Sequence, residues 1–207
     1  MTEHKIHTQP RDIQPCVILF NGFPGVGKLS STKGFQAALH ASHIPSHILD
    51  NHTLIDPVSA IHPLRTPAHY ALRKTIRKAA FEHLKALDHG VVILMTTCLA
   101  ATAADIEVFA EHVEIASARG IPLININITC DFATNRERLC CEERRHSGKS
   151  KLLDVEILTT LRQEHVLLDA SAHLPELQGV DIKQWSLDSS ALSVEDAVQA
   201  VFDLFVE

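Results

Sequence analysis

The sequence lacks the features that would place it in several large classes of protein. Its longest apolar runs, such as residues 91–95, are far too short to cross a bilayer. Residues 1–15 are polar and contain no apolar stretch typical of a secretory signal. The formal net charge of −6 gives no basic field that would attract long nucleic acid or an anionic membrane. We therefore expect a soluble cytoplasmic protein without a membrane partner.

Zinc-binding motifs are also missing, although the sequence has five cysteines and 14 histidines. None of these residues has the paired C-x-x-C or the H-E-x-x-H spacing of a zinc site. Cys16, Cys98 and Cys130 lie in or beside apolar runs, where we expect buried free thiols, and Cys140 adjoins Cys141 on a predicted helix. The histidines are expected to be scattered over surface and core.

Strand-like and helical patterns alternate from residue 16 to the end of the chain. Apolar runs predict strands at 16–20, 46–50, 90–97, 121–130 and 183–188. Helical periodicity predicts helices over 27–43, 68–88, 103–119, 131–144, 154–170 and from 193 onward. Segment 51–67 contains several prolines and is too broken for a long helix.

The predicted strands are apolar on both faces, which is typical of a parallel sheet covered by helices on both sides. Hydrophobic residues make up 45% of the 207 residues, which is enough for the core of one domain. We therefore predict an α/β protein with a single domain over residues 16–207 and a flexible lead-in at residues 1–15.

A glycine-rich stretch follows the first predicted strand, at the edge of the sheet where such folds bind ligands. Gly22, Gly27 and Lys28 match G-x-x-x-x-G-K. Glycines let backbone N–H groups, including those of Gly25 and Val26, surround a phosphate chain, and the lysine adds a positive charge. The alternative is a turn that merely joins strand to helix, but the strand–loop–helix context favours phosphate binding.

The residue after the lysine departs from the usual pattern. Leu29 stands where a serine or threonine hydroxyl would ligate magnesium, and Ser30 follows directly. We include Leu29 in the phosphate-binding loop and take Ser30 as the candidate hydroxyl for Mg²⁺, with Ser31 as the second choice.

Two negative findings separate classes of nucleotide-binding protein. The apolar run 90–97 ends in threonines rather than in the aspartate that GTPases and motor ATPases use for magnesium, and no guanine-specificity motif of the form Asn/Thr-Lys-x-Asp occurs. A small phosphotransferase instead needs an acceptor pocket, a carboxylate that orients or deprotonates the acceptor, and arginines.

Candidates for the acceptor site lie in the segment of about residues 50–78. Asp50 ends the second predicted strand at the same edge as the glycine-rich loop, although it could simply cap the strand. Asn51 and His52 would orient the acceptor, and Arg65 and Arg73 would bind it. The rival interpretation is a solvated basic face, because Arg73 is followed by Lys74, Arg77 and Lys78.

A second basic stretch surrounds a glycine-containing loop at about residues 144–153. We expect this loop to close as a lid over the triphosphate, with Arg138 and Arg144 supplying charge that stabilises the transferring group. Glutamates at 137, 142 and 143 partly neutralise the stretch, which disfavours long nucleic acid as a partner.

The segment "GFPGVGKLS" resembles the phosphate-binding loop of adenylate-kinase-like enzymes, in which an apolar residue also separates the lysine from the hydroxyl. The order of features over residues 16–206 resembles the P-loop small-molecule kinases. This group includes shikimate kinase, gluconate kinase, chloramphenicol phosphotransferase-like proteins and the nucleotide kinases.

This resemblance implies a three-layer fold with a five-stranded parallel sheet in the order 2-3-1-4-5, a small lid, and ATP with Mg²⁺ as the donor. It implies that Lys28 is the phosphate lysine, that Asp50 binds the acceptor and acts as base, and that Arg138 and Arg144 are the lid and adenine-side arginines. The paired lid cysteines of some adenylate kinases and the Asp-x-Asp of shikimate kinases are absent. No particular acceptor can therefore be transferred from the family.

The sequence thus favours an ATP-dependent phosphotransferase that moves the γ-phosphate of ATP to a small hydroxylated or phosphorylated metabolite. Two alternatives stay open. One is a nucleotide or polynucleotide 5′-kinase, and the other is a nucleotide-binding regulatory protein without transfer activity.

Overall fold

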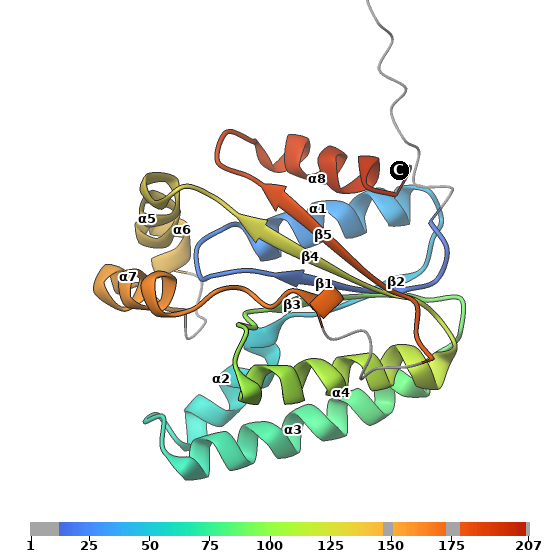
Figure 1. The fold of residues 1–207 in the computed structure, drawn as a ribbon, viewed down its shortest axis with the longest axis horizontal. Helices are drawn as coiled ribbons and strands as arrows, with labels where there is room; N and C mark the ends of the chain where they lie inside the picture. The colour runs from blue at the N-terminus through green and yellow to red at the C-terminus, as the bar shows by residue number, and fades with distance from the viewer. Residues whose placement is uncertain (1–12, 147–150, 173–178, 206–207) are drawn as a thin grey trace, which may run out of the picture.

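Five parallel strands form the centre of the structure, a computed structural model that describes residues 13–146, 151–172 and 179–205 (Figure 1). Their order in the sheet is β2-β3-β1-β4-β5, which confirms the predicted order. The strands are β1 (Val17–Asn21), β2 (Ser46–Leu49), β3 (Val92–Thr97), β4 (Leu123–Thr129) and β5 (Ile182–Asp188). Because all pairs are parallel, the carboxyl ends of the strands meet at one edge.

Helices cover both faces of this sheet, as predicted (Figure 1). One face is covered by α1 (Lys28–Ala41) and α8 (Val194–Asp203), and the other by α2 (Asn51–Ile61), α3 (Pro67–Lys85) and α4 (Ala103–Arg119). Side chains alternate along the strands, so each face has its own core. Phe20, Phe35 and Phe202 belong to the first, and Leu19, Phe81 and Phe109 to the second.

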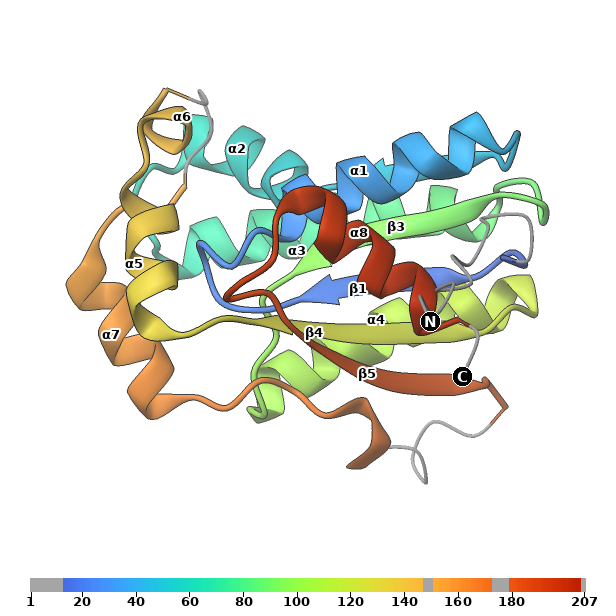
Figure 2. The ribbon, with the colours of Figure 1, turned by 90° about the horizontal axis from the view of Figure 1, so that it is seen from above.

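Three shorter helices lie beyond the carboxyl ends of the strands (Figure 2). They are α5 (Phe132–Cys140), α6 (Glu142–Arg145) and α7 (Val155–Glu164). The predicted helix 131–144 is therefore wrong as a single element, because the backbone at Cys141 is extended with ψ 149°. The predicted helix 154–170 ends early, since Leu167 pairs with Ala100 in an antiparallel bridge.

No helix spans all of segment 51–67, but the sequence did not predict α2, which spans Asn51–Ile61 with Pro57 inside it. An interior proline costs about 3 kcal/mol. The helix compensates by burying Leu54, Ile55 and Val58, each worth roughly 1.5–3 kcal/mol. Tertiary burial thus decides the structure of this segment.

The predicted helix ends agree better with the structure. The side chains of Asp131 and Ser193 accept hydrogen bonds from backbone N–H groups in the first turns of α5 and α8, at 2.9 and 3.0 Å. Most of the predicted lead-in, residues 1–12, lies outside the described residues, so the boundary at residue 15 stays a prediction. In the part of the chain that the structure describes, no helix is both long and apolar enough to cross a membrane.

Candidate active site

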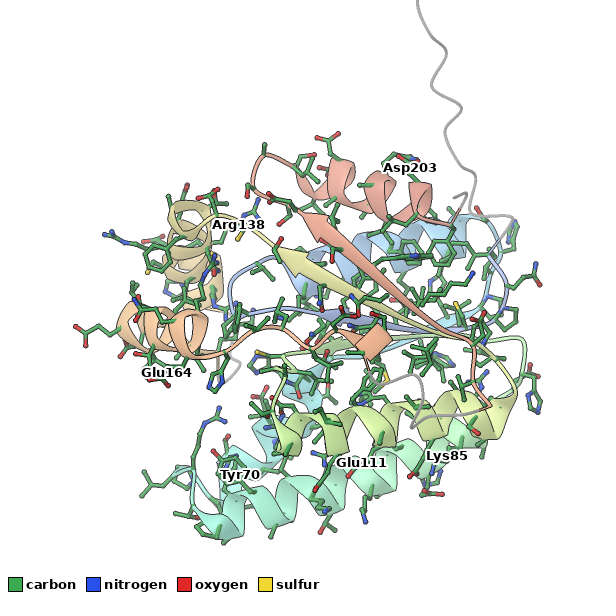
Figure 3. All side chains as sticks on the ribbon, in the orientation of Figure 1. Tyr70, Lys85, Glu111, Arg138, Glu164 and Asp203 are labelled. Carbon is green, nitrogen blue, oxygen red and sulfur yellow. The ribbon has the colours of Figure 1, made fainter. Side chains whose placement is uncertain are left out.

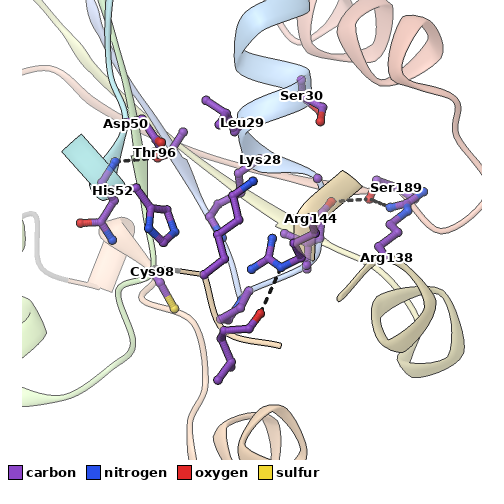
Figure 4. Close-up of a pocket in the computed structure, with 18 of the residues that line it drawn as sticks. Lys28, Leu29, Ser30, Asp50, His52, Thr96, Cys98, Arg138, Arg144 and Ser189 are labelled. Atoms are coloured by element: carbon purple, nitrogen blue, oxygen red, sulfur yellow. Dashed lines mark hydrogen bonds between the residues drawn. The ribbon is translucent and has the colours of Figure 1, made fainter. Parts of the chain in front are cut away.

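A cavity of about 910 Å³ opens at the carboxyl ends of the strands, between the glycine-rich loop, α2–α3 and α5–α7 (Figure 4). Every predicted site residue except Gly22 lines it. In Figure 4, Lys28 lies between Asp50 and His52 on one side and Arg144 and Arg138 on the other. Segments far apart in the sequence therefore converge on one chamber of a size that holds small ligands.

The glycine-rich loop runs from β1 to the first turn of α1, and its glycines have specific geometric reasons. A side chain at Gly22 would collide with the backbone carbonyl of Ile128 on β4. Gly25 and Gly27 have φ angles of +92° and +95°, which other residues adopt only with strain. Gly27 caps α1 without a side-chain hydrogen bond, so the first N–H groups of this helix are available to an anion.

The side chain of Lys28 folds back over this loop. Its Nζ donates hydrogen bonds to the carbonyl oxygens of Gly22 at 2.6 Å and Phe23 at 2.9 Å. Burial lowers the pKa of Lys28 to about 8; of the neighbouring groups, Cys98 opposes this shift and Arg144 adds to it. The lysine is therefore a poorly solvated cation at the phosphate loop, where an incoming phosphate would stabilise its charge.

Two serine hydroxyls near Lys28 are candidate ligands for Mg²⁺. Ser30 lines the cavity and is exposed, whereas Ser31 is only 4% exposed. Among the described residues, no three His, Cys, Asp or Glu side chains gather into a metal site. With nucleotide phosphates bound, a serine hydroxyl and a carboxylate would complete an oxygen donor set that suits Mg²⁺, which keeps several waters.

Asp50 is fixed at the start of α2, directly after β2. Its side chain is buried, and Thr96 at the end of β3 donates a hydrogen bond from Oγ1 to Asp50 Oδ1 at 2.6 Å. The same Thr96 oxygen accepts from the backbone N–H of Asn51 at 3.0 Å. The helix dipole at this N-terminus also favours a negative charge. The structure thus holds the Asp50 carboxylate in a fixed position beside the glycine-rich loop.

The acceptor side of the cavity contains the other predicted residues of this segment. Arg73 donates from Nη2 to Asn51 Oδ1 at 3.0 Å, and His52 Nδ1 lies 3.6 Å from Asp56 Oδ1 one helical turn on. Arg65 is exposed at the edge of the cavity. The structure therefore brings Asn51, His52, Arg65 and Arg73 to the same side of the cavity as Asp50.

The opposite side contains the predicted lid and base-side arginines. Arg138 donates from Nη1 to Ser189 Oγ at 3.0 Å and from Nη2 to Ser189 O at 2.9 Å, which ties α5 to the loop after β5. Arg144 donates from Nε to Leu152 O at 3.1 Å. Residues 147–150 of the predicted lid lie outside the described residues.

Sequence reasoning missed several cavity residues. In the sequence, Thr96 stands out only because it is not an aspartate, and the apolar run beside Cys98 predicts a buried thiol. Cys98 is half-buried and lines the cavity, and burial raises its pKa. Ser189 follows β5. Thr96 is the penultimate residue of β3, and Cys98 and Ser189 directly follow β3 and β5. This position at the carboxyl ends of the strands is the signal that could have identified them.

Comparisons with known proteins support the fold. No family model matches the chain, and no curated protein does. Among solved structures, Kti12 from Chaetomium thermophilum in complex with ADP-AlF3 has 17% identity and a TM-score of 0.58 over 93% of this chain and 97% of that one. The Mycobacterium tuberculosis APS kinase CysC, in complex with AMPPNP and APS, has 16% identity and a TM-score of 0.55 over 94% and 99%.

Shikimate kinase from Bacteroides thetaiotaomicron has 15% identity and a TM-score of 0.52 over 94% of this chain and 100% of that one. Identities this low concern the fold and not the substrate. Together with the strand order and the glycine-rich loop, they show that the chain has the fold of the P-loop small-molecule kinases.

Proposed function

We propose that the protein is an ATP-dependent phosphotransferase that moves the γ-phosphate of ATP, with Mg²⁺, to a small hydroxylated or phosphorylated metabolite. The observation that carries this proposal is the shared cavity. Lys28 and the glycine-rich loop form one side of it, and a fixed carboxylate, Asp50, with Arg73 forms another. A donor phosphate and an acceptor can therefore meet in one place.

On the donor side, backbone N–H groups of the loop and of the first turn of α1 bind the phosphates. Lys28 exchanges its two carbonyl partners for phosphate oxygens, and Arg144 adds positive charge from the lid side. Arg138 and the loop at Ser189 form the wall on which the nucleotide base lies. Bound Mg²⁺ would neutralise phosphate charge, and the hydroxyl of Ser30 would be its protein ligand.

On the acceptor side, Asp50 accepts a hydrogen bond from the acceptor hydroxyl and directs it toward the γ-phosphate. Phosphoryl transfer proceeds through a loose transition state in most analyses, so positioning and charge matter more than a strong base. The hydrogen bond from Thr96 and the N-terminus of α2 both favour the ionised carboxylate. Asp50 therefore orients the hydroxyl and receives its proton late in the transfer.

The regulatory alternative is supported by the missing strand-end aspartate at Thr96 and Thr97. It does not explain why a nucleotide-binding protein would keep a fixed carboxylate and an arginine opposite the phosphate loop. The 5′-kinase alternative fits the same cavity, although the net charge of −6 disfavours long nucleic acid.

The test is ADP release from MgATP with a panel of sugars, hydroxy acids, nucleosides, nucleoside monophosphates and a short 5′-hydroxyl oligonucleotide. With an active acceptor, Asp50→Asn should lower single-turnover transfer by about 10²–10⁴-fold while the Kd for ATP changes little. ATP binding without ADP release for any acceptor would instead support the regulatory protein. Transfer at the wild-type rate by a folded Asp50→Asn protein would remove Asp50 from the reaction.

A further inference from the structure

The cavity has a charge opposite to that of the whole chain. Seven cationic side chains and two carboxylates line it, whereas the chain as a whole has a net charge of −6. The phosphate loop, Arg138 and Arg144 lie where the nucleotide would bind. Arg73 of α3 donates to Asn51 at the start of α2, and Arg65 lies between α2 and α3, whereas Ser189 follows β5. The nucleotide therefore does not account for the positive charge of Arg65 and Arg73.

Two arginines one turn apart on α3 differ in their partners within the described parts of the chain: Arg77 is paired with a carboxylate, and Arg73 is not. Arg77 donates to Glu111 of α4, from Nε to Oε2 at 2.6 Å and from Nη2 to Oε1 at 3.1 Å. Figure 3 labels Glu111 beside α3 and α4. This pair stays between α3 and α4, outside the lining of the cavity. Arg77 thus has the bidentate carboxylate partner that a guanidinium prefers.

Arg73 lines the cavity and has no such partner in the described residues. Its printed hydrogen bond goes to a neutral amide oxygen of Asn51, and its Nε is buried without a hydrogen-bond partner there. Burial lowers the pKa of Arg73, as do the like charges of Arg77 and Arg65, yet an arginine stays protonated. Burying a cation beside other cations raises the free energy of the folded protein, and a bound anion would offset this cost.

We propose that the acceptor carries an anionic oxygen group, a carboxylate or a phosphate, which Arg73 binds with help from Arg65. This inference rests on the proposed function and narrows its acceptor to anions. Arg65 makes no hydrogen bond or ion pair with any other described residue, and its exposed side chain at the edge of the cavity can reach an anion from outside. Uncharged alcohols are poor acceptors, because they leave Arg73 desolvated and unmatched.

The same contacts set the direction of the acceptor. A chain of hydrogen bonds runs from Arg73 to Asn51, from the Asn51 N–H to Thr96, and from Thr96 to Asp50. This chain holds the guanidinium and the carboxylate in a fixed relation. Asp50 repels an anion and accepts from a hydroxyl, whereas Arg73 attracts the anion. The acceptor therefore lies with its hydroxyl at Asp50 and its anionic group toward α3.

The test compares matched acceptors by ADP release from MgATP. The pairs are gluconate and glucitol, shikimate and its methyl ester, glucose 6-phosphate and glucose, and adenosine 5′-monophosphate and adenosine. We expect kcat/KM for an anionic member to exceed that of its neutral partner by about tenfold to hundredfold, the range of one charge-assisted contact. Activity with the acids or with the phosphates tells which anion is used. Equal use of neutral partners would overturn the inference and leave the proposed function standing.

Variants of Arg73 and Arg77 distinguish loss of anion binding from a general loss of stability. Arg73→Gln should remove the preference for the anionic member, and Arg77→Gln should keep it while lowering the melting temperature. Arg73→Lys, which keeps the charge, serves if Arg73→Gln does not fold, and it should retain a weakened preference. An undiminished preference in Arg73→Gln would contradict the inference.

A binding arm covers the case in which no acceptor is phosphorylated. Protein saturated with AMPPNP and Mg²⁺ is titrated with inorganic phosphate and with gluconate by calorimetry. Binding that Arg73→Gln abolishes and Arg77→Gln retains would support the anion site even though the proposed function had failed. No binding of either anion to the loaded wild type, with no activity, would overturn both.

Discussion

At the scale of single residues, Lys28 combines two properties that make its charge sensitive to the nucleotide. Its Nζ is held by two carbonyl oxygens, and burial lowers its pKa to about 8. A bound phosphate stabilises the charged form, so the pKa of Lys28 is higher in the complex than in the free protein. Above about pH 8, where Lys28 of the free protein is deprotonated, binding of ATP is therefore accompanied by uptake of a proton.

We predict that ATP affinity is constant below about pH 8 and falls above it, by up to about tenfold per pH unit, because the free protein then binds fewer protons than the complex. Calorimetry at several pH values, in buffers of different ionisation enthalpy, measures both the Kd and the proton uptake. Lys28→Met should bind ATP more weakly and lose this pH dependence. A wild-type Kd that stays flat well above pH 8 would contradict the lowered pKa.

In the proposed reaction, we expect Thr96 to act as a positioning residue through its hydrogen bonds to Asp50 and Asn51. Its hydroxyl donates to Asp50 Oδ1 and accepts from the Asn51 N–H, so Thr96→Val removes both bonds while nearly keeping the side-chain shape. We predict that kcat falls by about tenfold, since Asp50 loses its orientation, and that the Kd for ATP stays unchanged. Thr96→Ser, which keeps the hydroxyl, should restore most of kcat. A Thr96→Ser variant as slow as Thr96→Val would point to packing as the cause.

At the scale of elements, the sequence predicts the strands and the glycine-rich loop well and the helices at the carboxyl edge poorly. The strands 17–21 and 92–97 are buried on both faces, so every residue in them had to be apolar or internally bonded. Segment 51–61 carries no such signal. Its helix forms because Leu54, Ile55 and Val58 are buried in the fold, a context that the prolines in the sequence conceal.

The glycine-rich loop offers a matched pair of substitutions, Gly25→Ala and Gly27→Ala. Both residues have positive φ, so both changes carry a strain of about 1–2 kcal/mol. A Cβ at Gly27 meets no atom within 4 Å, whereas one at Gly25 lies 2.6 Å from Asn135 Nδ2 and 3.1 Å from Asn135 O. Asn135 also donates to Pro24 O at 2.8 Å, and Arg162 of α7 donates to Asn135 Oδ1 at 2.8 Å. The loop, α5 and α7 are therefore coupled at this point.

We predict that Gly25→Ala is the more destabilising of the two, by a further ~1–3 kcal/mol, because it displaces Asn135 as well as straining the loop. Urea unfolding of the two variants and the wild type gives the comparison. Equal losses of unfolding free energy would show that Asn135 moves away without cost.

At the scale of the whole molecule, the fold could be predicted from the sequence because one period, strand then helix, repeats along the chain. The phosphate-loop half of the site could be predicted because its signal is local, from Gly22 to Lys28. The acceptor half depends on contacts between residues far apart, such as Thr96 with Asp50 and Arg73 with Asn51. Such pairs leave no pattern in one sequence. The sequence offers Asp50 and Arg73 as candidates only through their place along the chain, and it does not offer Thr96 at all.

At the same scale, we expect the stability of the fold toward acid to depend on a histidine outside the lining of the cavity. His112 of α4 is buried against Phe81, with ring centroids 4.8 Å apart, and its Nδ1 lies 2.7 Å from Val108 O. Burial lowers the pKa of His112 from 6.5 to about 4. Between these values the unfolded chain binds a proton that the folded protein does not, so unfolding becomes easier as the pH falls.

We predict that His112 alone costs the wild type roughly 3 kcal/mol of unfolding free energy as the pH falls from about 6.5 to 4, at 1.36 kcal/mol per pKa unit. His112→Gln cannot take up this proton, so its stability should decline less over the same interval, even if it is lower at neutral pH. Urea unfolding at matched pH values measures the difference between the two proteins. Parallel declines would mean that His112 is protonated in the folded state, and the carboxylates would then have to account for the whole loss.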